Sequence, residues 1–267
     1  MKKLKVGIIG CGAIGAALAK LIQKKFNSQM TVFFLCDRRA EKVLSLKTRL
    51  RSRPRAVSMT SLIKSSDLII EAASTEVARK AAKLAFRSGK NILVMSVGGL
   101  LDVKFPAGKS KGRVWVPSGA VAGVDALLAA REAGIQSVKI VTRKPPKGLQ
   151  EAPYFKKRKF PVLRGQKEIR VFKGNAREAV RSFPQNINVA ALLSLAGLGP
   201  DKTQVEIWTS KRYRLNQHEI TIQAKSGTID TRVQNLPSPE NPKTSALAIY
   251  AAAATIRKML NTIRIGT

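Results

Sequence analysis

The chain has 267 residues, of which 44% are hydrophobic and 24% charged. This length is enough for a large buried core in one or two domains, and the apolar content excludes a disordered chain. No apolar run reaches the roughly 18 to 20 uncharged residues that a membrane-spanning helix needs. The composition therefore predicts a globular cytoplasmic protein without a membrane segment.

The charge balance is unusual, because 49 Lys and Arg stand against 16 Asp and Glu, for a formal net charge of +33. Such a surplus is typical of proteins with acidic partners: nucleic acid, an anionic membrane surface or phosphate-bearing ligands. The basic segments are explained most simply as solvated surface, with attraction of an anionic substrate or nonspecific contact with nucleic acid as alternatives. The charge says nothing about the fold.

The beginning of the chain allows two interpretations. A basic start, an apolar stretch and the small residues near position 19 are typical of a secretory signal. Alternatively, residues 4–9 form a strand, residues 10–15 form a Gly-rich turn, and a helix follows. In that interpretation Gly10 permits the tight turn, Gly12 lets the backbone approach a pyrophosphate, and Gly15 lets the helix pack closely on the strand.

The next segment favours the second interpretation. Residues 30–36 are rich in β-branched and aromatic residues and predict a second strand, which ends at Asp37, about 20 positions after the glycines. An acidic residue at this place binds the ribose hydroxyls of a dinucleotide, so we expect NAD or NADP as the cofactor. The residues of this segment expected to bind it are Gly10, Gly12, Ala13, Ile14, Gly15 and Asp37.

Two pairs of residues beside this site have alternative roles. Arg38 and Arg39 either begin a solvated loop or pair with the 2′-phosphate of NADP. Cys11 and Cys36 are interpreted as small buried residues near the cofactor rather than as a redox pair. Two cysteines are too few to stabilise a fold of this size through disulfides, so disulfides are not expected to hold it together.

Strands and helices continue to alternate up to about residue 117. A basic helix is predicted over 41–52, strands over 66–73, 91–96 and 113–116, and a helix over 75–88. This pattern is typical of a doubly wound parallel sheet, the α/β fold of Rossmann nucleotide-binding domains. Ligands bind such sheets beyond the carboxyl ends of the strands, which adds Ala73 and Ser96 to the expected cofactor site.

The second half of the chain predicts a different architecture. Strands are expected over 137–143, 168–172, 203–209, 219–224 and 228–233, and helices over 124–134, 176–183 and 187–198. A late cluster of strands with few helices indicates an α+β domain with a mostly antiparallel sheet. An Ala-rich helix over 245–260 is apolar nearly all round at first, so we expect it to be buried against the first domain. The expected domains are 1–120, 121–240 and a C-terminal segment, 241–267, that packs on the first.

The chain has one histidine, His218, at the start of the strand predicted over 219–224. A lone histidine is more often structural than catalytic, yet its unperturbed pKa of about 6.5 suits proton transfer near neutrality. Without a second histidine, and with both cysteines in the nucleotide-binding half, a zinc site is not expected. The sequence also lacks GxSxG and Walker motifs, which leaves hydrolase and kinase functions without support.

Several segments, in order along the chain, resemble the L-aspartate dehydrogenase family. They are the glycine turn and residues 116–125, 142–146, 183–190, 216–220 and 241–245, with the sequences VPSGAVAGVD, TRKPP, FPQNINVA, NQHEI and NPKTS. The resemblance implies a homodimeric NAD(P)-dependent enzyme that oxidises L-aspartate to iminoaspartate, which yields oxaloacetate and ammonia or feeds NAD biosynthesis. In that family the histidine of the Asn-x-His-Glu motif is catalytic, which here implies His218, and further cofactor contacts fall on Ala122 and Asn188.

The residue types agree with this chemistry. Neutral His218 can accept a proton from substrate or water and return it in the reverse direction. Asn186 and Asn188 can donate amide hydrogen bonds to nicotinamide or substrate, or one of them caps the helix that begins there. Arg143 and Lys144 are candidates for binding the substrate carboxylates.

Two alternatives stay open. One is a dehydrogenase or reductase of the same two-domain plan that acts on another amino or imino acid. The other is a nucleotide-sensing, nucleic-acid-binding protein that kept the fold and lost catalysis, an interpretation that the basic surface favours.

Overall fold

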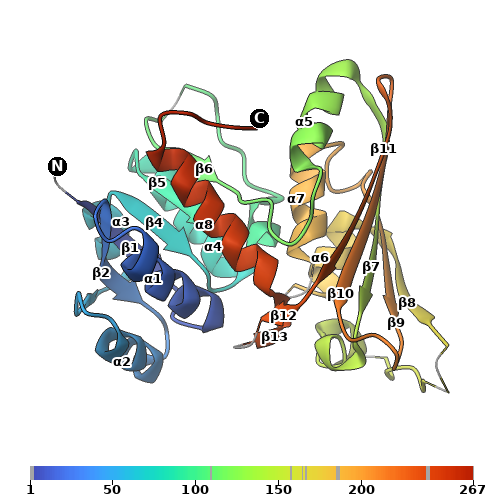
Figure 1. Ribbon diagram of the computed structural model, residues 1–267, viewed down its shortest axis with the longest axis horizontal. Coiled ribbons are helices and arrows are strands. Elements are labelled where there is room, and N and C mark those ends of the chain that lie inside the picture. Colours follow the sequence, from blue (N-terminus) through green and yellow to red (C-terminus); the bar gives the residue numbers. More distant parts are fainter. Residues whose placement is uncertain are drawn as a thin grey trace. The chain divides into compact units, whose positions relative to one another are not determined.

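A computed structural model describes residues 3–108, 110–156, 158–163, 165, 167–184, 187–238 and 241–266 (Figure 1). The chain divides into two compact units. Unit 1 consists of Met1–Pro117 and Ile249–Asn261, and unit 2 of Ser118–Ala248 and Thr262–Thr267. Within the described part of the chain, no helix combines the length and the apolar character needed to cross a bilayer.

Unit 1 is built on a parallel sheet with the strand order β3-β2-β1-β4-β5-β6. The order reverses between β1 and β4, which is the switch point where doubly wound sheets bind their ligands. The strands are β1 (Leu4–Ile9), β2 (Met30–Cys36), β3 (Arg55–Ala56), β4 (Leu68–Glu71), β5 (Asn91–Val94) and β6 (Val114–Trp115). The central strands are buried along most of their length, as expected for a sheet covered on both faces.

Helices cover both faces of this sheet. On one face α1 (Ala13–Lys25), α2 (Ala40–Arg49) and α8 (Ala246–Leu260) share a hydrophobic core with β1, and Figure 1 shows α1 and α8 on that face. On the other face, α3 (Met59–Ser65), α4 (Thr75–Arg87) and the short 3-10 helix η1 (Val97–Leu100) pack against the sheet. Successive residues of β1 point to opposite faces, so Ile8 belongs to the first core and Ile9 to the second.

Unit 2 contains a five-stranded sheet with the order β11-β10-β7-β9-β8. Only the β7–β9 pair is parallel among these pairings, and the other three are antiparallel. The strands are β7 (Ile135–Lys144), β8 (Ile169–Asn175), β9 (Gln204–Thr209), β10 (Asn216–Ala224) and β11 (Gly227–Asn235). The expected fold class, a Rossmann unit followed by a mostly antiparallel α+β unit, is confirmed.

One face of the unit 2 sheet is covered by helices, as Figure 1 shows. They are α5 (Val124–Ala133), α6 (Ala176–Ser182) and α7 (Asn188–Ala196), which contact β10, β8 and β7. Every second residue of β7 is buried from Val138 to Lys144, which identifies the inward-facing positions of that strand. The chain also forms two short 3-10 helices, η2 (Pro146–Gly148) and η3 (Pro153–Lys156), and a small ladder of β12 (Pro237–Ser238) with β13 (Asn241–Ser245).

The structure differs from the predicted elements at several places. The basic helix ends at Arg49 rather than at 52, and the chain then adds the short elements β3 and α3, which the sequence did not predict. Strand β10 begins at Asn216, so His218 lies within a strand. The predicted burial of the start of the last helix is wrong: Leu247 and Tyr250 are 39% and 59% exposed, because α8 packs through one stripe that contains Ala252 and Ile256.

Candidate functional site

The glycine turn of unit 1 is shaped to admit a dinucleotide. Gly10 has a φ of +95°, and a Cβ there would lie 2.5 Å from the Ala72 carbonyl oxygen. A Cβ on Gly15 would overlap the carbonyl oxygen of Gly10. In contrast, a Cβ on Gly12 would meet nothing within 4 Å, so the backbone there faces open space. Gly10 and Gly15 are required by the packing of the turn itself, whereas the open space at Gly12 is what an approaching pyrophosphate needs.

The N-terminus of the helix that follows this turn is suited to bind an anion. Gly12 is the N-cap of α1 and provides no side-chain cap, and the first turn, with Ala13 and Ile14, holds no acidic residue. No side chain therefore caps the first N–H groups of the helix. These groups form the positive end of the helix dipole. These residues fit the pyrophosphate of NAD or NADP.

Asp37 lies directly beside the turn, at the end of β2. Its carboxylate accepts the Cys11 N–H at 2.8 Å and the Arg39 N–H at 3.0 Å. The side chains of Arg38 and Arg39 are exposed, and the Arg39 Nε lies 4.0 Å from Asp37. A carboxylate held by backbone donors at this point can receive ribose hydroxyls, and the two exposed guanidinium groups that follow it can pair with a 2′-phosphate.

Both cysteines are free thiols. Burial, with the Asp37 charge second, raises the pKa of Cys11 to about 12, and the same two causes raise the pKa of Cys36. Since the thiolate is the reactive form, both residues act as small side chains of the site rather than as nucleophiles.

Glu71 is a further residue of the candidate cofactor site. From the sequence it was predicted only as part of the strand over 66–73. It is fully buried at the end of β4, where its carboxylate accepts the Ala73 N–H at 2.7 Å, the Ser96 N–H at 3.0 Å and the Ser96 hydroxyl at 2.9 Å. Burial raises the pKa of Glu71, and these hydrogen bonds oppose that shift. Glu71 thus ties together the ends of β4 and β5, which carry the predicted cofactor residues Ala73 and Ser96. An acid in an otherwise apolar buried strand was the signal that could have identified it.

Unit 2 gathers buried polar side chains at one end of its sheet. The carboxyl ends of β7, β9 and β11 and the start of β10 meet there, because β7 and β9 run parallel and β10 runs opposite to β7 and β11. We call these residues the polar cluster: Thr142, Lys144, Thr209, Ser210, Asn216, His218, Asn235, Ser238 and Ser245. Buried polar groups need partners, and several bonds connect this set, such as Asn216 Nδ2 to Ser245 Oγ at 3.3 Å and Thr209 Oγ1 to the Lys144 carbonyl at 2.9 Å.

His218 and Lys144 are the titratable members of the polar cluster. The Nδ1 atom of His218 lies 3.1 Å from the Thr142 hydroxyl oxygen. Burial, and after it the Lys144 charge, lowers the pKa of His218 to about 3, so the imidazole is neutral at physiological pH. Burial lowers the pKa of Lys144 to about 8. A neutral imidazole beside a buried amine can exchange protons with a ligand and hold a carboxylate.

Arg143, the other candidate for the substrate carboxylates, does not belong to the polar cluster. As the neighbour of Thr142 and Lys144 in a strand it points to the opposite face of the sheet. There its guanidinium lies 2.6 Å from Glu219 and 3.4 Å from Glu168. These two ion pairs connect β7, β10 and the start of β8 behind the polar cluster.

The remaining predicted residues lie on loops and at a helix start of unit 2. The loop that contains Ala122 is tied to β11, because Asn235 Nδ2 donates to the Ala120 carbonyl at 2.8 Å and Thr231 Oγ1 to the Ala122 carbonyl at 3.4 Å. Asn188 is the first residue of α7, whose N-cap is Ile187. Asn186 lies outside the described residues.

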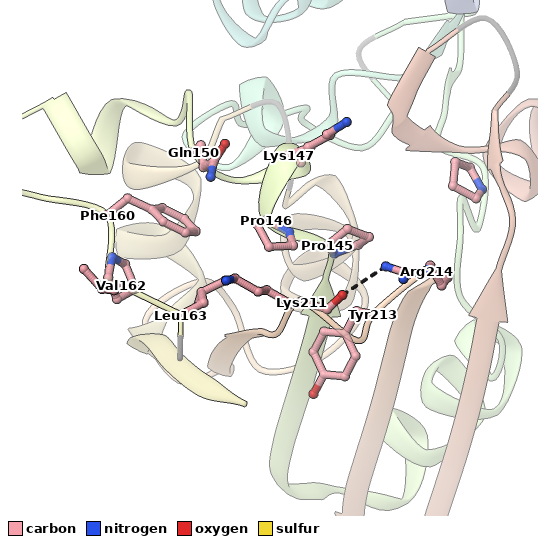
Figure 2. A pocket seen from close by; sticks show the side chains of 13 residues that line it. Pro145, Pro146, Lys147, Gln150, Phe160, Val162, Leu163, Lys211, Tyr213 and Arg214 are labelled. Atoms are coloured by element: carbon pink, nitrogen blue, oxygen red, sulfur yellow. Dashed lines mark hydrogen bonds between the residues drawn. The ribbon is translucent and has the colours of Figure 1, made fainter. Parts of the chain in front are cut away.

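A separate pocket of about 850 Å³ lies in unit 2 (Figure 2). Pro145 and Pro146, which directly follow Lys144, form part of its wall together with residues 160–163 and with Tyr213. Lys147, Lys211 and Arg214 line it, and Figure 2 shows the Arg214 guanidinium donating to the Lys211 carbonyl. Neither His218 nor Lys144 lines this pocket, so it is distinct from the polar cluster.

The glycine turn, the acidic residue after β2 and the second sheet unit together define a two-unit, NAD(P)-binding dehydrogenase. A family model described as the NAD-binding domain of homoserine dehydrogenase matches residues 10–106, and one described as the C-terminal part of aspartate dehydrogenase matches residues 125–259. The chain belongs to the L-aspartate dehydrogenase family.

Full-length relatives support this assignment. The L-aspartate dehydrogenase of Methanosarcina barkeri is 41% identical over 99% of this chain and 100% of the relative. That of Nitrosopumilus maritimus is 35% identical over 98% of this chain and 99% of the relative. The crystal structure of aspartate dehydrogenase from Thermotoga maritima is 25% identical, with a TM-score of 0.77 over 99% of this chain and all of that chain.

Proposed function

We propose that this protein oxidises L-aspartate to iminoaspartate with NAD or NADP, and that water then converts the imine to oxaloacetate and ammonia. The observation that carries this proposal is full-length similarity to L-aspartate dehydrogenases in a chain whose single histidine is buried beside a buried lysine. Such a pair suits a dicarboxylate substrate whose amine must lose protons.

In this proposal NAD or NADP binds at the glycine turn and at the end of β2. Gly10, Gly12, Ala13, Ile14 and Gly15 would surround the pyrophosphate, Asp37 the ribose hydroxyls, and Arg38 a 2′-phosphate. Ala73, Ser96, Ala122 and Asn188 are the further contacts that we propose. The chemistry that a bound NAD(P) supplies is acceptance of a hydride from Cα of the substrate.

The side chains of unit 2 bind the substrate and move its protons. Lys144 pairs with a substrate carboxylate, and Asn186 donates its amide to the substrate. His218 takes a proton from the substrate amine or from the attacking water and returns it in the reverse direction. Substrate binding also favours this role, because a carboxylate that neutralises Lys144 removes one of the two causes that lower the pKa of His218.

A homodimer is part of the proposal. The face of the unit 2 sheet opposite to its helices carries ion pairs of Glu206 with Lys139 and of Glu219 with Arg143 and Arg232. In a chain with a net charge of +33, a face where acids offset the basic residues reduces repulsion between two copies. Light scattering after size-exclusion chromatography tests whether the protein is a homodimer. A role in NAD biosynthesis and a cytoplasmic location stay predictions from the sequence.

Absorbance of NADH and NADPH tests the reaction directly. We expect aspartate to reduce the cofactor far faster than glutamate or alanine, and oxaloacetate with ammonia to oxidise it. His218→Ala should lose turnover and keep cofactor binding. No reduction with aspartate and no oxidation in reverse would reject the proposal. Tight, salt-dependent binding of DNA by a chain without turnover, unchanged in His218→Ala, would instead support the nucleic-acid-binding alternative.

A further inference from the structure

Thr142 and His218 face each other across the β7–β10 pair. They are direct partners in the antiparallel register, and their side chains point to the helix-covered face, where they are 0% and 2% exposed. The Thr142 hydroxyl oxygen lies 3.1 Å from His218 Nδ1. Direct partners in such a ladder have Cβ atoms about 5 Å apart, and the branched Thr142 side chain has few rotamers, so the contact is well defined.

We propose that Thr142 is a positioning residue for His218: its hydroxyl oxygen accepts the Nδ1–H bond and thereby leaves the lone pair of Nε2 for the reacting proton. The proposal rests on the proposed function for its catalytic part. Its structural part is the direction of the contact between the two side chains: the hydroxyl can accept from Nδ1–H or donate to Nδ1, and the proposal is that it accepts.

The tautomer matters because the ring is neutral before substrate binds. A neutral imidazole has one N–H, and only its other nitrogen can act as a base. With the hydrogen on Nδ1, Nε2 accepts one proton from the substrate amine or from water, and the imidazolium keeps its Nδ1–H bond to Thr142. Release of that proton from Nε2 restores the starting tautomer. The hydroxyl oxygen can accept the same hydrogen bond in both states, so the ring need not turn during the cycle.

Among the residues that the structure describes, one nearby charge acts on the ring. Lys144, two positions after Thr142 on β7, acts on His218 from the same face. On β10, Glu219 points to the opposite face and pairs with Arg143. On β11 the register partner of His218 is Val233, which is apolar. Thr142 therefore contacts the ring nitrogen Nδ1 directly, whereas Lys144 acts on the ring through its charge.

The single histidine makes the test direct. Incorporation of ¹⁵N-histidine gives one pair of imidazole signals, whose shifts identify the tautomer without substrate or turnover. We expect the Nδ1–H tautomer in the wild type and in Thr142→Ser, and a shift toward Nε2–H in Thr142→Val, which keeps the shape and removes the hydroxyl. With aspartate, kcat of Thr142→Val should fall at least about 10-fold with little change in KM, and Thr142→Ser should recover most of it.

A matched control is Thr203→Val, because Thr203 is also fully buried and its hydroxyl donates to the Gly199 carbonyl at 2.9 Å just before β9, away from the polar cluster. It should leave the imidazole signals and kcat unchanged. An Nε2–H tautomer in the wild type would overturn the proposal even if Thr142→Val does not fold. Equal losses in the Ser and Val variants, with unchanged imidazole signals, would also overturn it. If the wild type has the expected tautomer but does not oxidise aspartate, the proposed function fails and the role of Thr142 in selecting the tautomer stands.

Discussion

Lys144 and His218 are buried on the same face of the unit 2 sheet, and the charge of Lys144 lowers the pKa of His218. Two groups that can both become cations are costly to bury together, because each raises the cost of charging the other. A dicarboxylate that enters between them offsets this cost. The pair is therefore better explained as part of a binding site for anions than as a source of stability.

Lys144→Met should raise KM for aspartate about 10- to 100-fold, since a charge-assisted hydrogen bond contributes about 1.5 to 3 kcal/mol. The same variant should raise the pKa of His218, because burial remains and the neighbouring cation is lost. Steady-state kinetics and an NMR titration of the single imidazole measure both effects. Lys202→Met is the matched control, since Lys202 is an exposed lysine of the same unit in the turn before β9. An unchanged KM would remove Lys144 from the substrate site.

Lys144 also predicts how stability depends on pH. Its pKa falls from 10.5 in the unfolded chain to about 8 in the folded one, so between these values the unfolded chain binds a proton that the folded chain does not. The free energy of unfolding contributed by this group therefore rises with pH from about 8 to 10.5 and is constant below 8. Below pH 8 the charged form costs about 3 kcal/mol.

Lys144→Met should accordingly be more stable than the wild type at pH 7, and this advantage should shrink as the pH approaches 10.5. Urea unfolding at a series of pH values measures the difference, and effects of the other lysines cancel between the two chains. Parallel curves for wild type and variant would mean that Lys144 keeps an ordinary pKa in the folded protein.

The cofactor half of the site could be predicted from sequence because its signals are local. The strand over 4–9, the glycine turn and the strand over 30–36 stand within one βαβ unit, and the structure gives both strands the predicted bounds. Short elements were missed for the opposite reason. Helix α3 has only seven residues and depends on its Ser58 cap and the packing of Leu62 and Ile63 on the sheet, none of which is a periodic pattern.

The substrate half depends on strand pairing, which one sequence does not determine. Thr142 and His218 are 76 positions apart, and their contact requires the register of β7 with β10. Alternation along β7 implies that Arg143 and Lys144 point to opposite faces, but which one faces inward depends on the partner helices. The same limit applies to Glu71, because its hydrogen-bond donors Ala73 and Ser96 follow two different strands, β4 and β5.

Glu71→Ala should weaken both the fold of unit 1 and its cofactor site. The substitution removes the acceptor of the Ala73 and Ser96 N–H groups, and the loss of these two part-buried hydrogen bonds costs about 0.5 to 1.5 kcal/mol each. Urea unfolding and a fluorescence titration with NADH should both show the loss. Glu76→Ala, which removes an exposed ion pair with Lys80, is the control and should change neither. Normal NADH affinity in a destabilised Glu71→Ala would show that the two strand ends do not depend on this carboxylate for binding.

The glycine turn allows fold and cofactor binding to be separated. Gly12→Ala adds a methyl group where nothing lies within 4 Å, at a backbone φ of −73° that any residue adopts. We expect its free energy of unfolding to stay within about 1 kcal/mol of the wild type, a margin that includes the poorer N-cap. Because the methyl occupies the space through which a pyrophosphate approaches, NADH affinity should fall at least about 10-fold.

Gly15→Ala should behave in the opposite way, because its methyl group would overlap the Gly10 carbonyl oxygen and force α1 away from the sheet. A backbone shift of this kind costs about 1 to 3 kcal/mol or more, so the variant should unfold at lower urea and lose NADH binding with its fold. Gly148→Ala, another glycine in open space but in unit 2, controls for the substitution itself and should match the wild type in both assays. If Gly12→Ala binds NADH as tightly as Gly148→Ala does, the dinucleotide does not pass over Gly12, and the cofactor site must be placed elsewhere on unit 1.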